Sequence, residues 1–216
     1  MADSVLPPKK IAVLGDSHCR GMADALKLNN KDIQTLSIIH PRGTLAISAK
    51  YQTTSHIVYT FDPDFIYIHC GHNDLVYHPS LNQTPINSQD SRTHTISLAQ
   101  LIQRNHPRSK VIISALFPRT FTFKSPLDEE EVAAFNRLAK RHGQRLRAEA
   151  SQLPTPIQVS LNNPIWNRIS RAEEKSQMFL KDGLHLTDNG KLAIAAAWLN
   201  DISIKVQLMT PDHPCK

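Results

Sequence analysis

Three residues far apart in the sequence could together perform acyl transfer. Ser17 ends the tripeptide Gly15-Asp16-Ser17 after an apolar run, and Asp182 and His185 lie three residues apart near the C-terminus. A serine hydroxyl becomes a useful nucleophile when a base removes its proton, and His185 could be that base. Asp182 could bind the other imidazole nitrogen and stabilise the imidazolium. These residues predict a serine hydrolase, although a capped turn and a surface loop would explain each motif taken alone.

Two further positions could supply donors to an oxyanion. Asn73 lies in the stretch GHND (71–74) after another apolar run, and its side-chain amide could donate to a developing negative charge. Gly43 is the only glycine between residues 21 and 71, and its backbone N–H could join that of Ser17. A helix is expected after Ser17, so its dipole would also favour an anion there. The alternative is that these are ordinary turns, which favour Gly, Asn and Asp.

The elements that must position these residues are short apolar runs alternating with helical patterns. The apolar runs predict strands at 11–14, 33–39, 65–68, 111–113 and 157–159. The helical spacing of apolar residues predicts helices at 21–28, 45–59, 91–105, 127–153 and from a cap at Thr187 to about 200. A loop is expected at 75–90. Continuous apolar strands separated by helices indicate a parallel sheet covered on both faces. Ligands of such sheets bind beyond the carboxyl ends of the strands, so the chemistry-bearing residues should meet at one edge.

The composition is that of an ordinary globular domain. The chain has 216 residues, 40% hydrophobic and 20% charged, which predicts a single domain at 10–204 with a flexible lead at 1–9 and a tail at 205–216. No apolar run reaches the roughly 18–20 residues that cross a bilayer, and Met1–Lys10 has no apolar signal segment. Cys19, Cys70 and Cys215 are an odd, widely spaced set, which favours a reducing compartment and an intracellular, cytoplasmic location.

The net charge of +6 leaves a nucleic-acid or membrane partner open. Its densest cations alternate with apolar positions of one predicted helix, which favours a solvated helix face, with a phosphate-binding surface for RNA or a membrane as the alternative. They are Arg137, Lys140, Arg141, Arg145 and Arg147.

Together the four blocks resemble the SGNH (GDSL-type) hydrolase superfamily. That family carries Gly-Asp-Ser near the N-terminus, a glycine after the second strand, Gly-x-Asn after the third, and Asp-x-x-His near the C-terminus; all four are present in this order between residues 11 and 190. The resemblance implies an α/β fold, a three-layer αβα sandwich with a five-stranded parallel, flavodoxin-like sheet. It implies a catalytic triad of Ser17, Asp182 and His185, with an oxyanion hole of Ser17, Gly43 and Asn73. It implies no cofactor and no metal.

Two histidines depart from the common family pattern. Residue 18 is His where many members have Leu, which adds a titratable group near Ser17. Residue 72 is also His, and with His69 and Cys70 it suggests a metal site. Neighbouring strand residues point to opposite faces, so we expect His72 to lie at the rim of the pocket instead.

The resemblance implies hydrolysis of a small acyl ester or lipid through an acyl-serine intermediate. We expect a short acyl group such as acetyl, and Phe117, Phe121 and Phe123 could line the acyl pocket, touch a membrane surface or pack in the core. A carbohydrate deacetylase would share the mechanism. The rival class is a catalytically weak SGNH-fold module that binds RNA, lipid or protein.

A narrower resemblance rests on the variants Gly-Asp-Ser-His and Gly-His-Asn-Asp. They are similar to the esterase domain in the first open-reading-frame protein of some vertebrate non-LTR retrotransposons. That resemblance would make the chain one domain of a larger protein.

Overall fold

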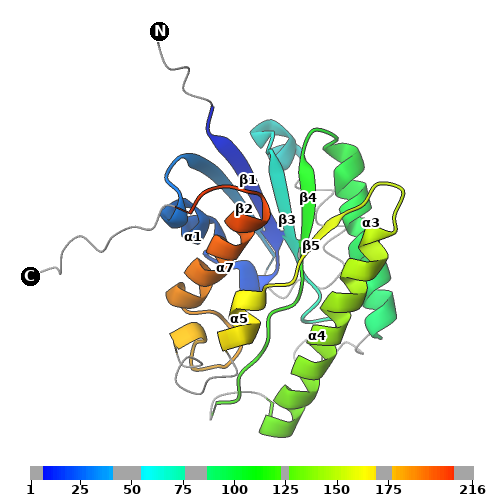
Figure 1. Cartoon of the computed structure of the whole chain (residues 1–216), viewed down its shortest axis with the longest axis vertical. Helices are drawn as coiled ribbons and strands as arrows, with labels where there is room; N and C mark the ends of the chain where they lie inside the picture. Colours follow the sequence, from blue (N-terminus) through cyan, green and yellow to red (C-terminus); the bar gives the residue numbers. More distant parts are fainter. Residues whose placement is uncertain (1–6, 41–54, 76–86, 123–126, 169–176, 207–216) are drawn as a thin grey trace, which may run out of the picture.

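Five parallel strands form a single sheet in the order β2-β1-β3-β4-β5 (Figure 1). The computed structural model describes residues 7–40, 55–75, 87–122, 127–168 and 177–206. The strands are β1 (Lys9–Gly15), β2 (Ile33–Ile39), β3 (Phe65–His69), β4 (Lys110–Ser114) and β5 (Gln158–Ser160). The predicted five-stranded parallel sheet is confirmed, and its order is that of flavodoxin-like folds.

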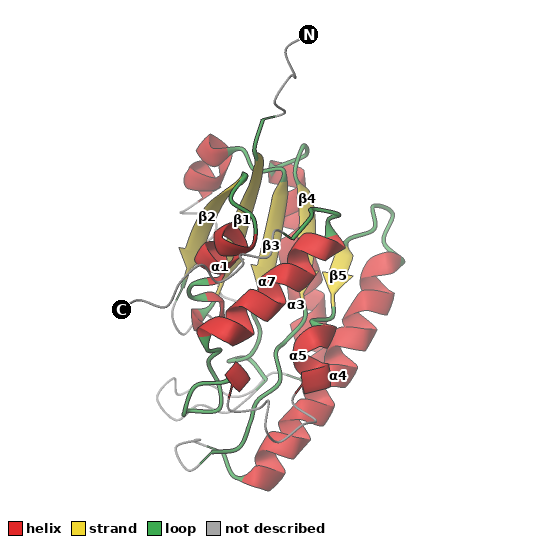
Figure 2. Cartoon of the chain, turned by 60° about the vertical axis from the view of Figure 1, so that its left-hand side comes forward, coloured by secondary structure: helices red, strands yellow, loops and turns green. Residues whose placement is uncertain are grey.

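Helices cover both faces of this sheet, which gives three layers (Figure 2). One layer holds α1 (Met22–Asn29), α5 (Asn163–Arg168) and α7 (Asp188–Asp201). The other holds α3 (Ser88–Asn105), α4 (Glu129–Ser151) and the helical residues 55–61. The predicted αβα sandwich is therefore confirmed.

Strand alternation divides the core into two clusters, one on each face. In β1, Ile11 and Val13 pack with α1 and α7, whereas Ala12 and Leu14 pack with α3 and α4. All four side chains are buried. Burial on both faces explains why the strand appears in the sequence as an unbroken apolar run rather than as an alternating one.

Side-chain caps set where the longer helices begin. Thr187 caps α7 as predicted, and Asp128 and Glu131 form a capping box at the start of α4. The predicted start of α3 at residue 91 was wrong. Asn87 accepts hydrogen bonds from the backbone N–H groups of Gln89 and Asp90, so Ser88–Asp90 are helical rather than part of a loop.

α5 is a helix that the sequence pattern did not predict. A helix of six residues is too short to show a helical apolar period, and only Ile165 in it is buried. Pro164 is tolerated because it stands in the first turn.

Some predicted segments lie partly outside the described residues. Residues 55–61 are helical, so the helix predicted at 45–59 ends two residues later than expected, while its first part is not described. β1 already includes Lys9, the last residue of the predicted lead. None of the described helices is both long and apolar enough to span a membrane.

Candidate active site

Ser17 opens a short 3-10 turn at the carboxyl end of β1. The turn covers Ser17–Cys19, and the Asp16 side chain caps it by accepting a hydrogen bond from His18 N (2.9 Å). α1 begins only after Gly21, so Ser17 does not lie at the N-terminus of a long helix. The expectation that a helix dipole acts on Ser17 was therefore wrong, because a three-residue turn aligns too few peptide dipoles.

Asp182 and His185 lie on one turn that is closed by backbone hydrogen bonds. Leu180 N donates to His185 O (2.8 Å), and Gly183 N donates to Leu180 O (2.9 Å). Gly183 has a positive φ of 67°, which favours glycine. One oxygen of Asp182 accepts hydrogen bonds from the backbone N–H groups of Leu184 (2.9 Å) and His185 (3.0 Å). The backbone of the turn therefore holds the Asp182 carboxylate in place independently of its contact with the His185 imidazole.

The structure brings Ser17, His185 and Asp182 into one hydrogen-bonded row. His185 Nδ1 lies 2.7 Å from Asp182 Oδ2, and His185 Nε2 lies 3.3 Å from Ser17 Oγ. Burial raises the pKa of Asp182, but the hydrogen bonds from His185 and Leu184 outweigh it, so the pKa lies below its usual value. Asp182 is thus a carboxylate at neutral pH, and its partner Nδ1 carries the proton. Nε2 then presents its lone pair to the Ser17 hydroxyl.

The oxyanion-hole candidates are described only in part. Asn73 lies in the turn after β3, which begins at Gly71 with a φ of 107°. β3 is paired with β1, so Asn73 follows the strand next to the one that precedes Ser17. Gly43 lies outside the described residues.

Histidines form a buried cluster beside this row. His18 stacks on His72 at 4.0 Å between ring centroids and on His185 at 5.3 Å. His69 stacks on Phe117 at 4.0 Å, and its Nδ1 lies 3.0 Å from Ser114 Oγ. Burial lowers the pKa of His69 to about 4, so its ring is neutral at pH 7.

The expectation that His72 lies at the pocket rim was wrong. The side chain is fully enclosed, and its Nε2 lies 3.0 Å from Phe117 O. Burial lowers the pKa of His72 well below its usual value, and the neighbouring His18, His69 and Arg119 act in the same direction. The His18–His72 stack could have been anticipated, because both residues lie three positions beyond the paired Gly15 and His69 at the ends of adjacent strands.

The same stack brings together a different metal-ligand set from the one considered in the sequence. One candidate ligand atom from each of Asp16, His18 and His72 lies within 4.8 Å of the others. Asp16 Oδ1, however, already lies 2.8 Å from His18 Nδ1. The two rings are inclined by 15°, and Asp16 Oδ2, His18 Nε2 and His72 Nδ1 are enclosed without a hydrogen-bond partner in the described part of the chain. The three residues thus form a stack joined by one internal hydrogen bond, with one further polar atom of each residue left unpaired.

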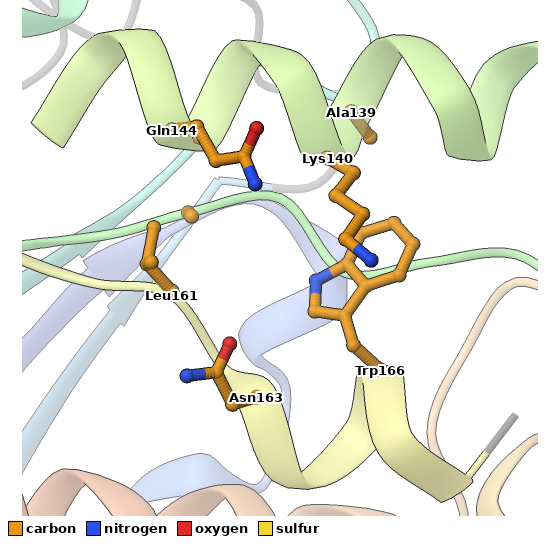
Figure 3. A pocket seen from close by; sticks show the side chains of 8 residues that line it. Ala139, Lys140, Gln144, Leu161, Asn163 and Trp166 are labelled. Atoms are coloured by element: carbon orange, nitrogen blue, oxygen red, sulfur yellow. The ribbon is translucent and has the colours of Figure 1, made fainter.

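Two hollows of the described surface lie away from the Asp182–His185–Ser17 row. A cavity of about 40 Å³ lies between α4 and α5, where Lys140 and Gln144 face Asn163 and Trp166 (Figure 3). A groove of about 540 Å³ runs beside α7 and includes Leu28, Met178 and Leu192. Neither is lined by Ser17 or His185.

The three phenylalanines considered for an acyl pocket have different environments. Phe117 is part of the core, Phe121 is 45% exposed, and Phe123 lies outside the described residues.

Comparisons with known proteins agree with this fold. Residues 13–193 match the GDSL-like lipase/acylhydrolase family. No curated protein sequence is similar enough to be matched to the chain. Among solved structures, the acetyl xylan esterase AlAXEase is similar with a TM-score of 0.65 at 15% identity, covering 89% of this chain and 99% of that one.

Two further structures show the same fold. A catalytic mutant of Axe2, an acetylxylan esterase from Geobacillus stearothermophilus, has a TM-score of 0.64 at 13% identity and covers 94% of this chain and 99% of that one. The lipase/acylhydrolase from Enterococcus faecalis has a TM-score of 0.62 at 16% identity and covers 93% and 99%. With the family model matching most of its length, the chain belongs to the GDSL-like lipase/acylhydrolase (SGNH) family.

Proposed function

We propose that this protein is a serine esterase that hydrolyses short-chain acyl esters, acetyl esters above all, through an acyl-serine intermediate. The observation that carries the proposal is the row Asp182–His185–Ser17, with contacts of 2.7 and 3.3 Å. A carboxylate, an imidazole and a hydroxyl in this order are what nucleophilic acyl transfer requires. The row also lies at the carboxyl edge of the sheet, where parallel α/β folds bind ligands.

In the first half of the proposed reaction, Ser17 Oγ attacks the ester carbonyl while His185 Nε2 takes the hydroxyl proton. The bond from Oγ to carbon forms, and the carbonyl oxygen becomes an oxyanion held by the backbone N–H groups of Ser17 and Gly43 and by the side chain of Asn73. His185 then gives its proton to the alcohol oxygen, the carbon–oxygen bond breaks, and the alcohol leaves.

In the second half a water molecule repeats the sequence against the acyl-serine. His185 takes a proton from the water, the hydroxide adds to the acyl carbon, and the bond to Ser17 Oγ breaks as the serine regains its proton. Asp182 stabilises the imidazolium in both halves without itself becoming protonated. No cofactor enters either half of this proposed cycle.

Labelling with a fluorophosphonate tests the nucleophile. The wild-type protein should be labelled and Ser17→Ala should not, because the probe reacts with an activated serine. Ser97→Ala, an exposed serine on α3, is the matched control and should be labelled like the wild type. Labelling that survives Ser17→Ala would refute the assignment.

Hydrolysis of 4-nitrophenyl esters from acetyl to octanoyl tests the acyl length. The names of two structural neighbours, both acetylxylan esterases, support the choice of acetyl. We expect kcat/KM to fall as the acyl chain lengthens. A rise with chain length would contradict the short-acyl proposal.

A second candidate function is RNA binding by the outer face of α4. Its five cations, Arg137, Lys140, Arg141, Arg145 and Arg147, are all exposed, and no carboxylate lies between residues 137 and 148. Binding of a single-stranded RNA should weaken steeply with salt and with the triple change Arg137→Ser, Arg141→Ser and Arg145→Ser. Unchanged affinity in the triple variant would exclude this face.

We propose that the chain is a retrotransposon-encoded esterase domain located in the cytoplasm. Such a domain would combine ester hydrolysis with RNA binding. Two features support it: the variants Gly15-Asp16-Ser17-His18 and 71–74, and the free, buried thiols of Cys19 and Cys70. Detection of the protein in the cytosolic fraction, bound to RNA, would test it.

A further inference from the structure

Arg119 is a buried arginine in the segment that follows β4. The residue is 7% exposed, and α4 holds its backbone on both sides: Arg119 N donates to Asn136 Oδ1 (2.8 Å), and Asn136 Nδ2 donates to Arg119 O (2.8 Å). The guanidinium carbon lies 4.3 Å from the centre of the Phe135 ring. Backbone and side chain are thus both positioned, so the guanidinium has a defined place.

The guanidinium of Arg119 has no polar partner among the described residues. Nε is enclosed and makes no hydrogen bond, and no carboxylate of the described chain forms an ion pair with the group. Nε is the nitrogen of this guanidinium that is both enclosed and unpaired. Because Nη1 and Nη2 also have no polar partner but are not enclosed, they border open space. A guanidinium carries five N–H donors. Burying such a charge without a partner is costly, and buried charges are normally paired.

Arg119 remains a cation at neutral pH. Burial lowers its pKa to about 10, and the negative charge of Asp16 acts in the opposite direction. The oxygen Oδ1 of Asp16 is occupied by His18, so Asp16 acts on Arg119 only through its charge. A positive charge is therefore available for a ligand.

The contacts of its neighbours connect Arg119 to the catalytic row. Thr120 N donates to Gly183 O (2.8 Å), which attaches the segment to the turn that carries Asp182. On the other side Phe135 stacks with His72 at 5.8 Å, and the charge of Arg119 lowers the pKa of His72. Arg119 thus stands between the Asp182 turn and the turn after β3, at the same edge of the sheet as Ser17.

We propose that Arg119 binds a carboxylate carried by the substrate, so that the preferred esters are anionic. This proposal rests on the esterase function proposed above and specifies its substrate class. The planar fork of a guanidinium matches the two oxygens of a carboxylate, and the Phe135 ring contacts the guanidinium at 4.3 Å. A carboxylate at this place would satisfy the open donors and be brought to the ester-cleaving row in the same step.

Two matched pairs of esters test the proposal and distinguish where the charge lies. One pair is 4-acetoxybenzoate and its methyl ester, which differ by a charge on the alcohol side. The other is 4-nitrophenyl hydrogen adipate and 4-nitrophenyl hexanoate, which differ by a charge on the acyl side. The wild type should favour the charged member of at least one pair by ten-fold or more in kcat/KM, mainly through KM.

Arg119→Met keeps an unbranched stem over Phe135 and should reduce that charged-to-neutral ratio at least ten-fold. Arg108→Met removes an exposed cation that is paired with Asp62 and should leave the ratio unchanged. A wild type without preference for either charged ester would overturn the proposal, as would an Arg119→Met ratio within two-fold of the wild type.

A binding measurement separates failure of this proposal from failure of the esterase function. Isothermal titration of Ser17→Ala with 4-acetoxybenzoate requires no turnover. We expect binding that weakens at least ten-fold when Arg119→Met is added. Absence of binding to folded Ser17→Ala would overturn the carboxylate site even if neutral esters are hydrolysed, whereas binding without any hydrolysis would refute only the esterase function.

Discussion

At the scale of single residues, the contact with Asp182 favours the tautomer in which His185 carries its proton on Nδ1, as the proposed base requires. Asp182 Oδ2 contacts His185 Nδ1 at 2.7 Å, while Asp182 Oδ1 accepts the two backbone N–H groups of the turn. These two oxygens have separate tasks: one holds the loop, and the other orients the base.

Asp182→Asn separates the two tasks. The amide oxygen can still accept the backbone N–H groups, but the NH₂ group faces His185 and favours the wrong tautomer, so kcat should fall roughly 10³–10⁴-fold. Steady-state hydrolysis of 4-nitrophenyl acetate measures the loss, and the melting temperature should change little. Asp188→Asn, which alters an exposed pair with Lys191, is the control and should keep full activity. A variant that retained more than a tenth of the wild-type kcat would contradict the role of Asp182.

Some properties of single residues could be predicted from the sequence and others could not. The proximity of Ser17, Asp182 and His185 could be predicted because their types and spacing are restrictive and because strand ends of a parallel sheet meet at one edge. The burial of His72 could not be predicted. A residue just beyond a strand end is exposed or enclosed according to what packs over it, and here His18 and Phe135 pack over it. The unpaired state of Arg119 is likewise a property of packing, since nothing in a single arginine after a strand indicates it.

At the scale of elements, the turn that carries the acid–base pair depends on a close approach to the segment after β4. Thr120 N donates to Gly183 O (2.8 Å), and a Cβ at Gly183 would overlap Thr120 O. The turn can lie there only because residue 183 has no side chain.

Gly183→Ala should therefore displace the turn and separate His185 from Ser17. We expect kcat to fall by at least ten-fold and the unfolding free energy to fall by more than the roughly 1 kcal/mol that a left-handed alanine costs. Gly21→Ala is the matched control, because Gly21 also has a positive φ but faces only the flexible Lys191 side chain. It should lose stability and keep its kcat. Equal kcat in Gly183→Ala and the wild type would show that the turn is free to relax.

A helix or strand could be predicted when its pattern of apolar residues extended over enough positions to be distinctive. β1, β3 and β4 were recognised because burial on both faces makes each a largely apolar run, whereas β2 is partly exposed and mixes polar with apolar residues. α4 was recognised because its apolar residues recur over 23 positions. α5 was missed because six residues give no period. The start of α3 was misplaced because the prolines at 79 and 85 favoured a loop, whereas the Asn87 cap determines the boundary.

At the scale of the whole molecule, buried neutral histidines make stability depend on pH. Burial lowers the pKa of His69 to about 4, and it lowers that of His142 to about 4 with a contribution from the Arg92 charge. The unfolded chain protonates both near the ordinary value of about 6.5 and the folded protein does not. Stability is therefore complete above about pH 6.5 and falls as the pH decreases toward 4.

The expected loss at pH 5 is about 2 kcal/mol for each of the two histidines, a large part of the 5–15 kcal/mol typical of a domain. Urea unfolding at pH 7.5 and pH 5 measures it. His142→Gln removes one titrating group but can keep a hydrogen bond to Ser91 Oγ, now 3.2 Å from His142 Nε2, and should reduce the loss by about 2 kcal/mol. His94→Gln, an exposed histidine on the same α3 as Ser91, should not reduce it. Equal stability of the wild type at the two pH values would contradict this account.

The wide separation of Ser17 from the Asp182–His185 turn has a consequence for synthesis. The proposed nucleophile leaves the ribosome early, with β1, whereas the proposed base follows only after all five strands have been made. Nascent chains that end before residue 178 contain all five strands but lack Asp182 and His185, so we expect their Ser17 not to react. The chain length at which fluorophosphonate labelling first appears during translation would therefore show when the Asp182–His185 turn and α7 dock onto the sheet. Labelling of Ser17 would thus report the last step of folding.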